Sequence, residues 1–195
     1  MELYTVRTTP PCKRYNHWFL GFALLYLAII GAGCGRGAIE PASEGDQTMA
    51  LDFTSSAFDQ GGNIPQKYTC DGANLSSPLV WSGVPEDTQS LALIVDDPDA
   101  PGRTYVHWVL FNISPEQDGL PEGVQDVGVL GSNNRNQPSY TGPCPPSGPA
   151  HRYFFKLYAL DSQLNLQRGA SKAELLDAMD GHIVAQGELM GKYAR

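Results

Sequence analysis

The sequence predicts a single domain built mainly of β-strands. Its 195 residues suffice for one good-sized core but not comfortably for two. Glycine (21) and proline (15) are abundant, which favours a turn-rich β architecture over a helical bundle. Most apolar segments are short, alternate with polar positions or are rich in β-branched residues, and end at turn-forming residues, as strands do.

Residues 1–33 are predicted to be a signal peptide. Basic residues precede an uninterrupted apolar run at 18–30, which is shorter than the roughly 20 residues of a spanning helix. The small residues Gly31-Ala32-Gly33 before Cys34 resemble the lipobox of bacterial lipoproteins, in which the cysteine is lipidated. An uncleaved anchor and an ordinary secretory signal are the alternatives, and all three place the domain outside the cytoplasm.

Residues 34–48 are small and polar without periodicity, which predicts a flexible tether before a domain at 49–195. The chain has a net charge of −8, and loss of residues 1–33, with three basic and one acidic residue, leaves −10. This charge argues against nucleic-acid binding through a basic surface. Anionic lipids do not attract such a surface, so a lipid anchor would hold it at a membrane.

The domain begins with alternation at Leu51, Phe53 and Ser55, which predicts a first strand, and Pro78–Trp81 predicts a second. The next two strands, Leu91–Val95 and Val106–Ile113, are strongly apolar and flank a proline-rich acidic turn. This strand–turn–strand unit is the part of the chain around which we expect the rest to be organised.

The second half of the domain begins with a long polar segment, 114–140, in which no strand is predicted. Arg152–Leu160 alternates as a strand and is expected to lie centrally. Ser171 and Glu174 form a capping box that predicts a helix over Lys172–Met179, ending at Gly181. The pattern at 182–190 leaves strand and short helix open.

The acidic turn contains the first candidate site residues, Asp97, Asp99 and His107. Pro98 and Pro101 give the turn one shape, so a carboxylate can pair with the imidazole, select its tautomer and raise its pKa. Asp-rich turns also cap their own backbone amides. Local pattern leaves both interpretations open for Asp97 and His107, and favours capping for Asp96.

A second segment has the same form, with a rigid loop followed by polar residues on a strand. Cys144-Pro145-Pro146 stiffens the loop, and His151-Arg152-Tyr153 begins the strand. His151 and Tyr153 point to one face and Arg152 to the other, where an ion pair with an Asp of the first turn is expected. A His and Tyr buried in a β core is the alternative.

Cys70 and Cys144 remain once Cys12 is lost with the signal peptide and Cys34 is lipidated. A remaining pair in an oxidising compartment suggests one disulfide, and two separately buried thiols are the alternative. No metal site is predicted, because neither the cysteines nor the Asp and His residues have a ligand spacing. The sequence also lacks the nucleophile-elbow, phosphate-loop and zinc-protease motifs of common enzymes.

These two segments resemble the phosphatidylethanolamine-binding protein family, in its bacterial and archaeal Raf-kinase-inhibitor-like branch. The resemblance is carried by Asp97–Pro101 with His107-Trp108, and by Gly142–Pro146 with His151–Tyr153. It continues through Tyr68–Gly72, Ser77-Pro78-Leu79, Gly181-His182 and Gly191-Lys192-Tyr193, and covers roughly residues 50–195.

The resemblance implies a β-sandwich, with an antiparallel-rich central sheet, a second sheet and a few short peripheral helices. It also implies a small anion-binding pocket lined by Asp97, His107, Cys144, Pro145, Pro146, His151 and Tyr153, with Asp99 and Arg152 bracing the loops. Phosphate-like groups, including phospholipid headgroups, are the implied ligands.

We therefore expect a membrane-tethered, extracytoplasmic, non-catalytic domain that binds phosphate-like groups without a cofactor. A hydrolase or lyase with a His/Asp general base is one alternative. A protein-interaction module, such as a protease inhibitor acting through residues 114–142, is another.

Overall fold

The structure, a computed structural model, describes residues 48–195. The predicted signal peptide, Cys34 and all but the last residue of the tether lie outside the described residues. Within residues 48–195, no helix has both the length and the apolar character needed to cross a membrane.

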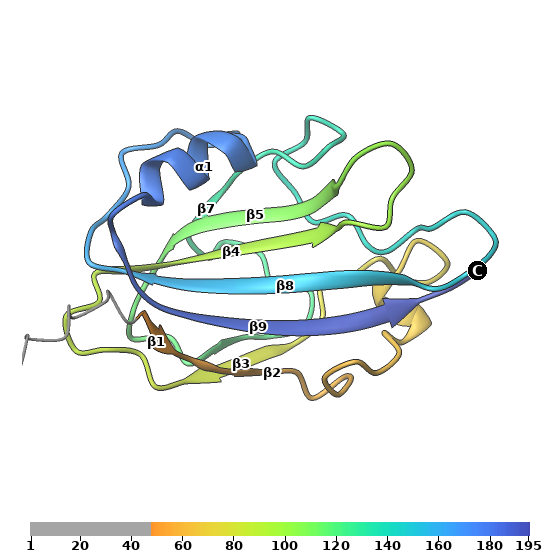
Figure 1. Cartoon of the computed structure of the whole chain (residues 1–195), viewed down its shortest axis with the longest axis horizontal. Helices are drawn as coiled ribbons and strands as arrows, with labels where there is room; N and C mark the ends of the chain where they lie inside the picture. Colours follow the sequence, from red (N-terminus) through yellow and green to blue (C-terminus); the bar gives the residue numbers. More distant parts are fainter. Residues whose placement is uncertain (1–47) are drawn as a thin grey trace, which may run out of the picture. The chain divides into compact units, whose positions relative to one another are not determined.

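The larger of two sheets has the strand order β1-β9-β8-β4-β5-β7 (Figure 1). Its strands are β1 Met49–Ala50, β4 Ser90–Asp97, β5 Tyr105–Ile113, β7 Val129–Leu130, β8 His151–Leu160 and β9 Ile183–Tyr193. All pairs are antiparallel except β1 with β9. The predicted central position of β8 is confirmed, and the undecided segment at 182–190 belongs to strand β9.

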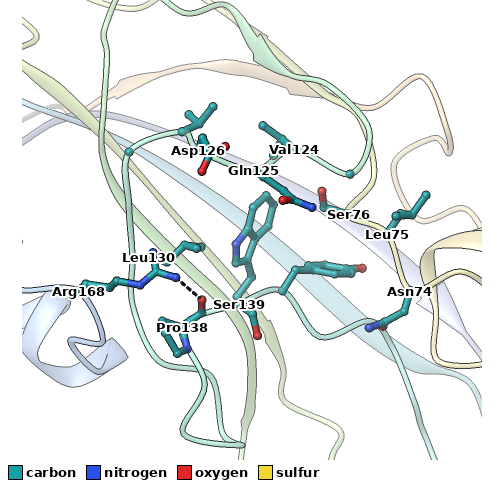
Figure 2. Close-up of a pocket in the computed structure, with 15 residues that line it drawn as sticks. Asn74, Leu75, Ser76, Val124, Gln125, Asp126, Leu130, Pro138, Ser139 and Arg168 are labelled. Carbon is teal, nitrogen blue, oxygen red and sulfur yellow. Dashed lines mark hydrogen bonds between the residues drawn. The ribbon is translucent and has the colours of Figure 1, made fainter.

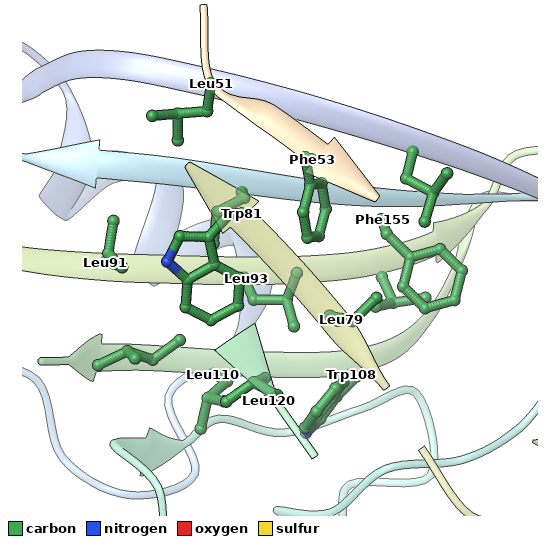
Figure 3. Close-up of a cluster of buried hydrophobic side chains, with 14 of the residues drawn as sticks. Leu51, Phe53, Leu79, Trp81, Leu91, Leu93, Trp108, Leu110, Leu120 and Phe155 are labelled. Carbon is green, nitrogen blue, oxygen red and sulfur yellow. The ribbon is translucent and has the colours of Figure 1, made fainter. Parts of the chain in front are cut away.

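A smaller antiparallel sheet packs against one face of the larger one. It contains β2 Asp52–Thr54, β3 Leu79–Ser82 and β6 Gly119–Leu120, in the order β2-β3-β6. The main core fills the space between the sheets, where Trp81, Leu93 and Phe155 are almost completely buried (Figure 3). The predicted mainly β fold with two sheets is therefore confirmed.

The helix α1, Lys172–Met179, covers the opposite face of the larger sheet. Leu175 and Met179 pack there with Ile94 and Phe111 of the sheet. Both faces of β4 are consequently covered, which is why its sequence is a continuous apolar run rather than an alternating one. The predicted capping box is present, with Ser171 and Glu174 each bonded to the other's backbone amide.

The first predicted strand is confirmed, and a prediction about a later segment was wrong. The strand expected around Leu51–Ser55 is β2, and the short strand β1 precedes it in the larger sheet, where Leu51 also donates its amide to Gln186 of β9. The segment 114–140, predicted to be a loop, contributes β6 and β7 to the two sheet edges. Strands of two residues leave almost no periodicity to detect.

Antiparallel pairing brings the candidate site residues to one end of the larger sheet. β4 ends at Asp97, opposite Tyr105 at the start of β5, and β8 begins at His151 beside them. The chain reverses between β4 and β5 over residues 98–104, with Gly102 at a φ of +83°. Asp97, predicted to lie in the turn, is instead the last residue of a strand.

Candidate functional site

A cavity of about 240 Å³ opens at this end of the larger sheet, and we call it the His107 pocket. The end of β4, the start of β5, the start of β8 and the loop at 135–146 form its walls. The lining residues are Asp97, Ala100, Pro101, Tyr105, His107, Arg135, Thr141, Gly142, Cys144, Pro145, Pro146 and His151.

His107 is 4% exposed, and its ring is held by the backbone of the opposite wall. The distance from its Nδ1 to the carbonyl oxygen of Thr141 is 2.7 Å. Because a carbonyl only accepts, Nδ1 carries the proton, and Nε2 of the neutral ring is left with a lone pair. Burial lowers the pKa of His107, against smaller opposing effects from its hydrogen bond to Thr141 and from Asp97.

Asp97 pairs with His151, not with His107. Its Oδ2 lies 2.8 Å from Nδ1 of His151, and its Oδ1 accepts the amide of Asp99 at 2.8 Å. Asp97 and His151 are 3% and 9% exposed. The pairing of Asp97 with His107 and a raised His107 pKa, one of the two interpretations left open, was therefore wrong, because the start of β8 brings a second imidazole to the carboxylate. Asp97 caps the turn through Oδ1, and its other carboxylate oxygen is the one that binds His151.

Asp99 and Arg152 lie outside the pocket and brace its two segments, and the predicted ion pair is confirmed. Asp99 accepts from Nη2 of Arg152 at 2.7 Å, from Nε at 2.8 Å and from the backbone amide at 3.0 Å. The Arg152 guanidinium holds the pKa of Asp99 at about 2. The bidentate pair ties the β4–β5 turn to the first residues of β8 and so keeps Asp97 beside His151.

Tyr153 does not line the pocket, contrary to the prediction. It is completely buried beneath His107, with the two rings edge to face at 5.2 Å. Burial raises its pKa far above the ordinary value, so the hydroxyl stays protonated. Tyr153 therefore supports the imidazole from below and is not available to a ligand at the surface of the pocket.

The wall at 141–146 is tied to the loop that follows the 3-10 helix η1, Gln66–Tyr68. Cys70 and Cys144 form a disulfide, which resolves the two alternatives for these cysteines. The Cys70 amide donates to Pro143 at 3.1 Å, and the Gly142 amide donates to Asn74 at 2.8 Å. Cys144, Pro145 and Pro146 thus reach the pocket, as expected, on a doubly anchored wall.

Arg135 and Tyr105 are pocket residues that were not predicted. Tyr105 precedes His107 by two positions on β5, and the rings lie 4.8 Å apart, so alternation on a strand could have identified it. No local sequence pattern indicates that Arg135 lines the pocket. Its loop is shaped by the buried Asn133, which bonds to the Arg135 amide and to the Thr141 hydroxyl.

Asp96 was expected to cap the turn and instead forms a separate buried charge cluster. It is 1% exposed and binds Nζ of Lys156, at 3.2 Å to the nearer oxygen, and Nζ of Lys172. The lysines belong to β8 and α1, so the cluster joins three elements on the helix-covered face of the sheet. No local pattern pairs residues this far apart in sequence.

The His107 pocket therefore combines two imidazoles, a buried carboxylate and an arginine, Arg135. Each imidazole has its Nδ1 bound to the protein, so Nε2 is the ring nitrogen available to a ligand. Protonation turns Nε2 from acceptor to donor. Among residues 48–195, no group of three His, Cys, Asp or Glu side chains is arranged to hold a metal ion.

Known proteins with similar sequences include uncharacterised microbial proteins. The chain is 52% identical over 151 residues to a UPF0098 protein of Methanothermobacter thermautotrophicus, covering 74% of this chain and 99% of that one. It is 45% identical over 150 residues to a UPF0098 protein of Chlamydia trachomatis, covering 74% and 99%.

Two solved structures are also similar. A phosphatidylethanolamine-binding protein homologue from Chlamydia trachomatis is 46% identical with a TM-score of 0.72, over 75% of this chain and 98% of that one. YbcL of Escherichia coli, described as a new member of the mammalian phosphatidylethanolamine-binding protein family, is 30% identical with a TM-score of 0.69. The match covers 74% of this chain and 98% of that one. The family model for phosphatidylethanolamine-binding protein matches residues 54–194, and the chain belongs to this family in its bacterial and archaeal form.

Proposed function

We propose that this protein binds phosphate-like groups in the His107 pocket without catalysing a reaction, and that it does so tethered to a membrane outside the cytoplasm. The observation that carries the proposal is the placement of two fixed imidazoles and Arg135 around one small cavity. At about 240 Å³ the cavity lies below the range of drug-sized ligand sites, roughly 300–1,000 Å³, and suits a single small group.

The charges of the pocket favour an anion that arrives with a proton. Burial lowers the pKa of His107, and Asp97 contributes one negative charge against one positive charge from Arg135, so a doubly charged anion gains little. A monohydrogen or dihydrogen phosphate group can donate to a bare Nε2, or a proton can be taken up by His107. Either route provides charge-assisted hydrogen bonds to the phosphate oxygens.

A phospholipid headgroup and a free phosphorylated molecule have the same phosphoryl chemistry. Phosphoethanolamine also carries an ammonium group, which can form a salt bridge with the Asp97 carboxylate. We expect inorganic phosphate to bind in either case. Tighter binding of phosphoethanolamine than of phosphate would favour a headgroup, and equal binding would favour a free phosphorylated ligand.

The test is an NMR titration that follows the ring C–H signals of the histidines with phosphate and with phosphoethanolamine. The signals of His107 and His151 should shift in a saturable way at millimolar concentration or below, and His107→Ala should weaken binding. His182→Ala is the matched control, because His182 is half-exposed and pairs with Asp161 outside the pocket. If saturating ligand shifts the ring signals of neither His107 nor His151, the anion-site proposal is wrong.

A hydrolase is the second candidate, and the Asp97–His151 pair is the observation that favours it. A carboxylate that holds Nδ1–H leaves Nε2 poised as a general base. The hydroxyls in the pocket wall are those of Tyr105 and Thr141, and the Thr141 hydroxyl oxygen accepts a hydrogen bond from Asn133. Turnover of a phosphomonoester that is lost in His151→Ala would establish this candidate in place of simple binding.

The membrane attachment is proposed from Cys34 and the residues before it. Mass spectrometry of the membrane fraction should find a mature chain that starts at diacylated Cys34, and a chain starting elsewhere would rule the attachment out. Structural disulfides persist in oxidising compartments. We therefore also expect the Cys70–Cys144 bond to be present in protein isolated without reductant.

A further inference from the structure

A second cavity has a volume of about 500 Å³, and we call it the Trp108 cavity (Figure 2). The two cavities are lined by neighbouring residues of the same two segments. His107 and Trp108 are consecutive on β5, and Thr141 and Tyr140 are consecutive in the loop, with one of each pair lining each cavity. Nothing in the proposed phosphate site uses the Trp108 cavity.

Aromatic rings and unpaired donors form the inner part of the Trp108 cavity. The rings of Trp108 and Tyr140 meet edge to face at 5.5 Å, and the Tyr140 hydroxyl donates to the carbonyl of Tyr68. Tyr140 therefore contributes only its ring. Within residues 48–195, Nε1 of Trp108 and Oγ of Ser76 are buried and have no hydrogen-bond partner. Unpaired buried donors are costly and are normally satisfied by some partner.

A short flap, residues 124–127, forms one side of the cavity, and Val124 and Gln125 lie across from Pro138 and Ser139 (Figure 2). Within the described chain, the flap makes no hydrogen bond of its own. It is held at Gly123, whose amide donates to Ser76, and it ends at Gly128. Gly123 and Gly128 have φ of +62° and +61°, so glycine stands at both ends of the flap. Val124 and Val127 hold the flap to the main core through apolar contacts only, so the flap can move aside to expose the buried donors.

Arg168 supplies a cation at the mouth of the cavity. Its Nη2 makes one long hydrogen bond, 3.3 Å, to the carbonyl of Pro138, which leaves its other N–H groups available. Asp126 also lines the mouth and opposes this charge in part. A singly charged ligand is therefore favoured over a phosphate dianion.

We propose that the Trp108 cavity binds a small aromatic carboxylate. Its ring packs against Trp108 and Tyr140 after the flap moves, and its oxygens accept hydrogen bonds from Arg168 and the buried donors. The ligand thus satisfies donors that the protein leaves unpaired. This proposal is independent of phosphate binding in the His107 pocket.

Phenylacetate is the probe, and the indole N–H signals in a ¹⁵N-correlated NMR spectrum are the readout. The Trp108 indole signal and the amides of 124–128 should shift in a saturable way at millimolar concentration. The Trp81 indole is an internal control, since its Nε1 already donates to Gln117 at 2.6 Å.

Two arginine variants separate the cavities. Arg168→Ala should weaken phenylacetate binding about tenfold and leave phosphate binding unchanged, because it removes a charge-assisted donor from one mouth only. Arg135→Ala should weaken phosphate binding and leave phenylacetate binding unchanged. Both side chains are exposed, so folding should survive either change. No saturable shift, shifts confined to the His107 pocket, or equal losses in both variants would each overturn the proposal.

Discussion

The two pocket histidines show how backbone and side-chain partners set the chemistry of a residue. Thr141 and Asp97 each accept the Nδ1–H of one ring, so both rings present Nε2 to the same cavity. For His107 the partner is an uncharged carbonyl in a buried position, and its pKa is lowered. A bound anion opposes that effect, because it stabilises the imidazolium.

Sulfate affinity should therefore depend on pH through His107. Sulfate has no proton near neutral pH, so it needs Nε2 of His107 as a donor, and binding raises the pKa of His107 above its lowered value in the free protein. Affinity should be greatest below the pKa of the free protein. It should fall by up to about tenfold per pH unit as pH rises through the pKa of the complex. Calorimetric titration between pH 5 and 8 checks this.

His107→Gln is the control for this pH dependence, because a glutamine amide donates at every pH. Other charged or titratable groups near His107 are Asp96, Asp97, Tyr105, Arg135, His151 and Tyr153. If the variant keeps the full pH slope, one of those groups carries it and the assignment to His107 fails.

At the scale of elements, the buried Asp96 joins β4, β8 and α1. Its carboxylate is 2% exposed, whereas the Lys156 and Lys172 side chains are 30% and 25% exposed. Removal of the carboxylate would leave two cations that can turn partly toward water. The free energy of unfolding should therefore fall by less than it does when a fully buried ion pair is broken, which costs roughly 3–5 kcal/mol.

Asp96→Ala should lower the free energy of unfolding by about 2–3 kcal/mol in urea denaturation. The matched control is Asp161→Ala, which removes the 46%-exposed partner of His182 and should cost less than about 1 kcal/mol. Equal effects of the two variants would show that the Asp96 cluster does not hold the three elements together.

The elements predicted correctly are those whose signals are local. The capping box at Ser171 requires residues three positions apart, and the apolar runs of β4 and β5 reflect burial along one continuous segment. The two-residue strands β6 and β7 exist because a sheet edge was available to pair with, which is a property of the neighbouring strands.

For the whole molecule, the Cys70–Cys144 disulfide closes a loop across 74 residues of sequence. The same bond holds the wall of the His107 pocket, because Cys144 lines the pocket. Stability and ligand affinity should therefore depend on the bond together.

Cys70→Ser with Cys144→Ser should lower the free energy of unfolding by about 2–4 kcal/mol, since a cross-link over a loop of this length restricts the unfolded chain. Phosphate affinity should fall as well, because the wall loses an anchor. Urea denaturation and the histidine titration measure the two effects. Wild-type protein with reductant, with free thiols verified by mass spectrometry, should match the variant, and undiminished stability there would contradict the prediction.

The mainly β architecture, the strands β4, β5 and β8 and the capped helix followed from residue types at short, regular spacings, whereas β9 was left open between strand and short helix. The family followed from the resemblance of whole motifs. The acidic turn and the proline-rich segment were also recognisable as two parts of one site. Residue partnerships were decided by the fold. Antiparallel pairing of β4 with β8 placed His151 beside Asp97 and buried Tyr153 beneath the pocket, and the loop at 135–146 brought Thr141 to His107 and Arg135 to the pocket mouth. Those contacts join segments far apart in the chain, and no spacing within one segment encodes them.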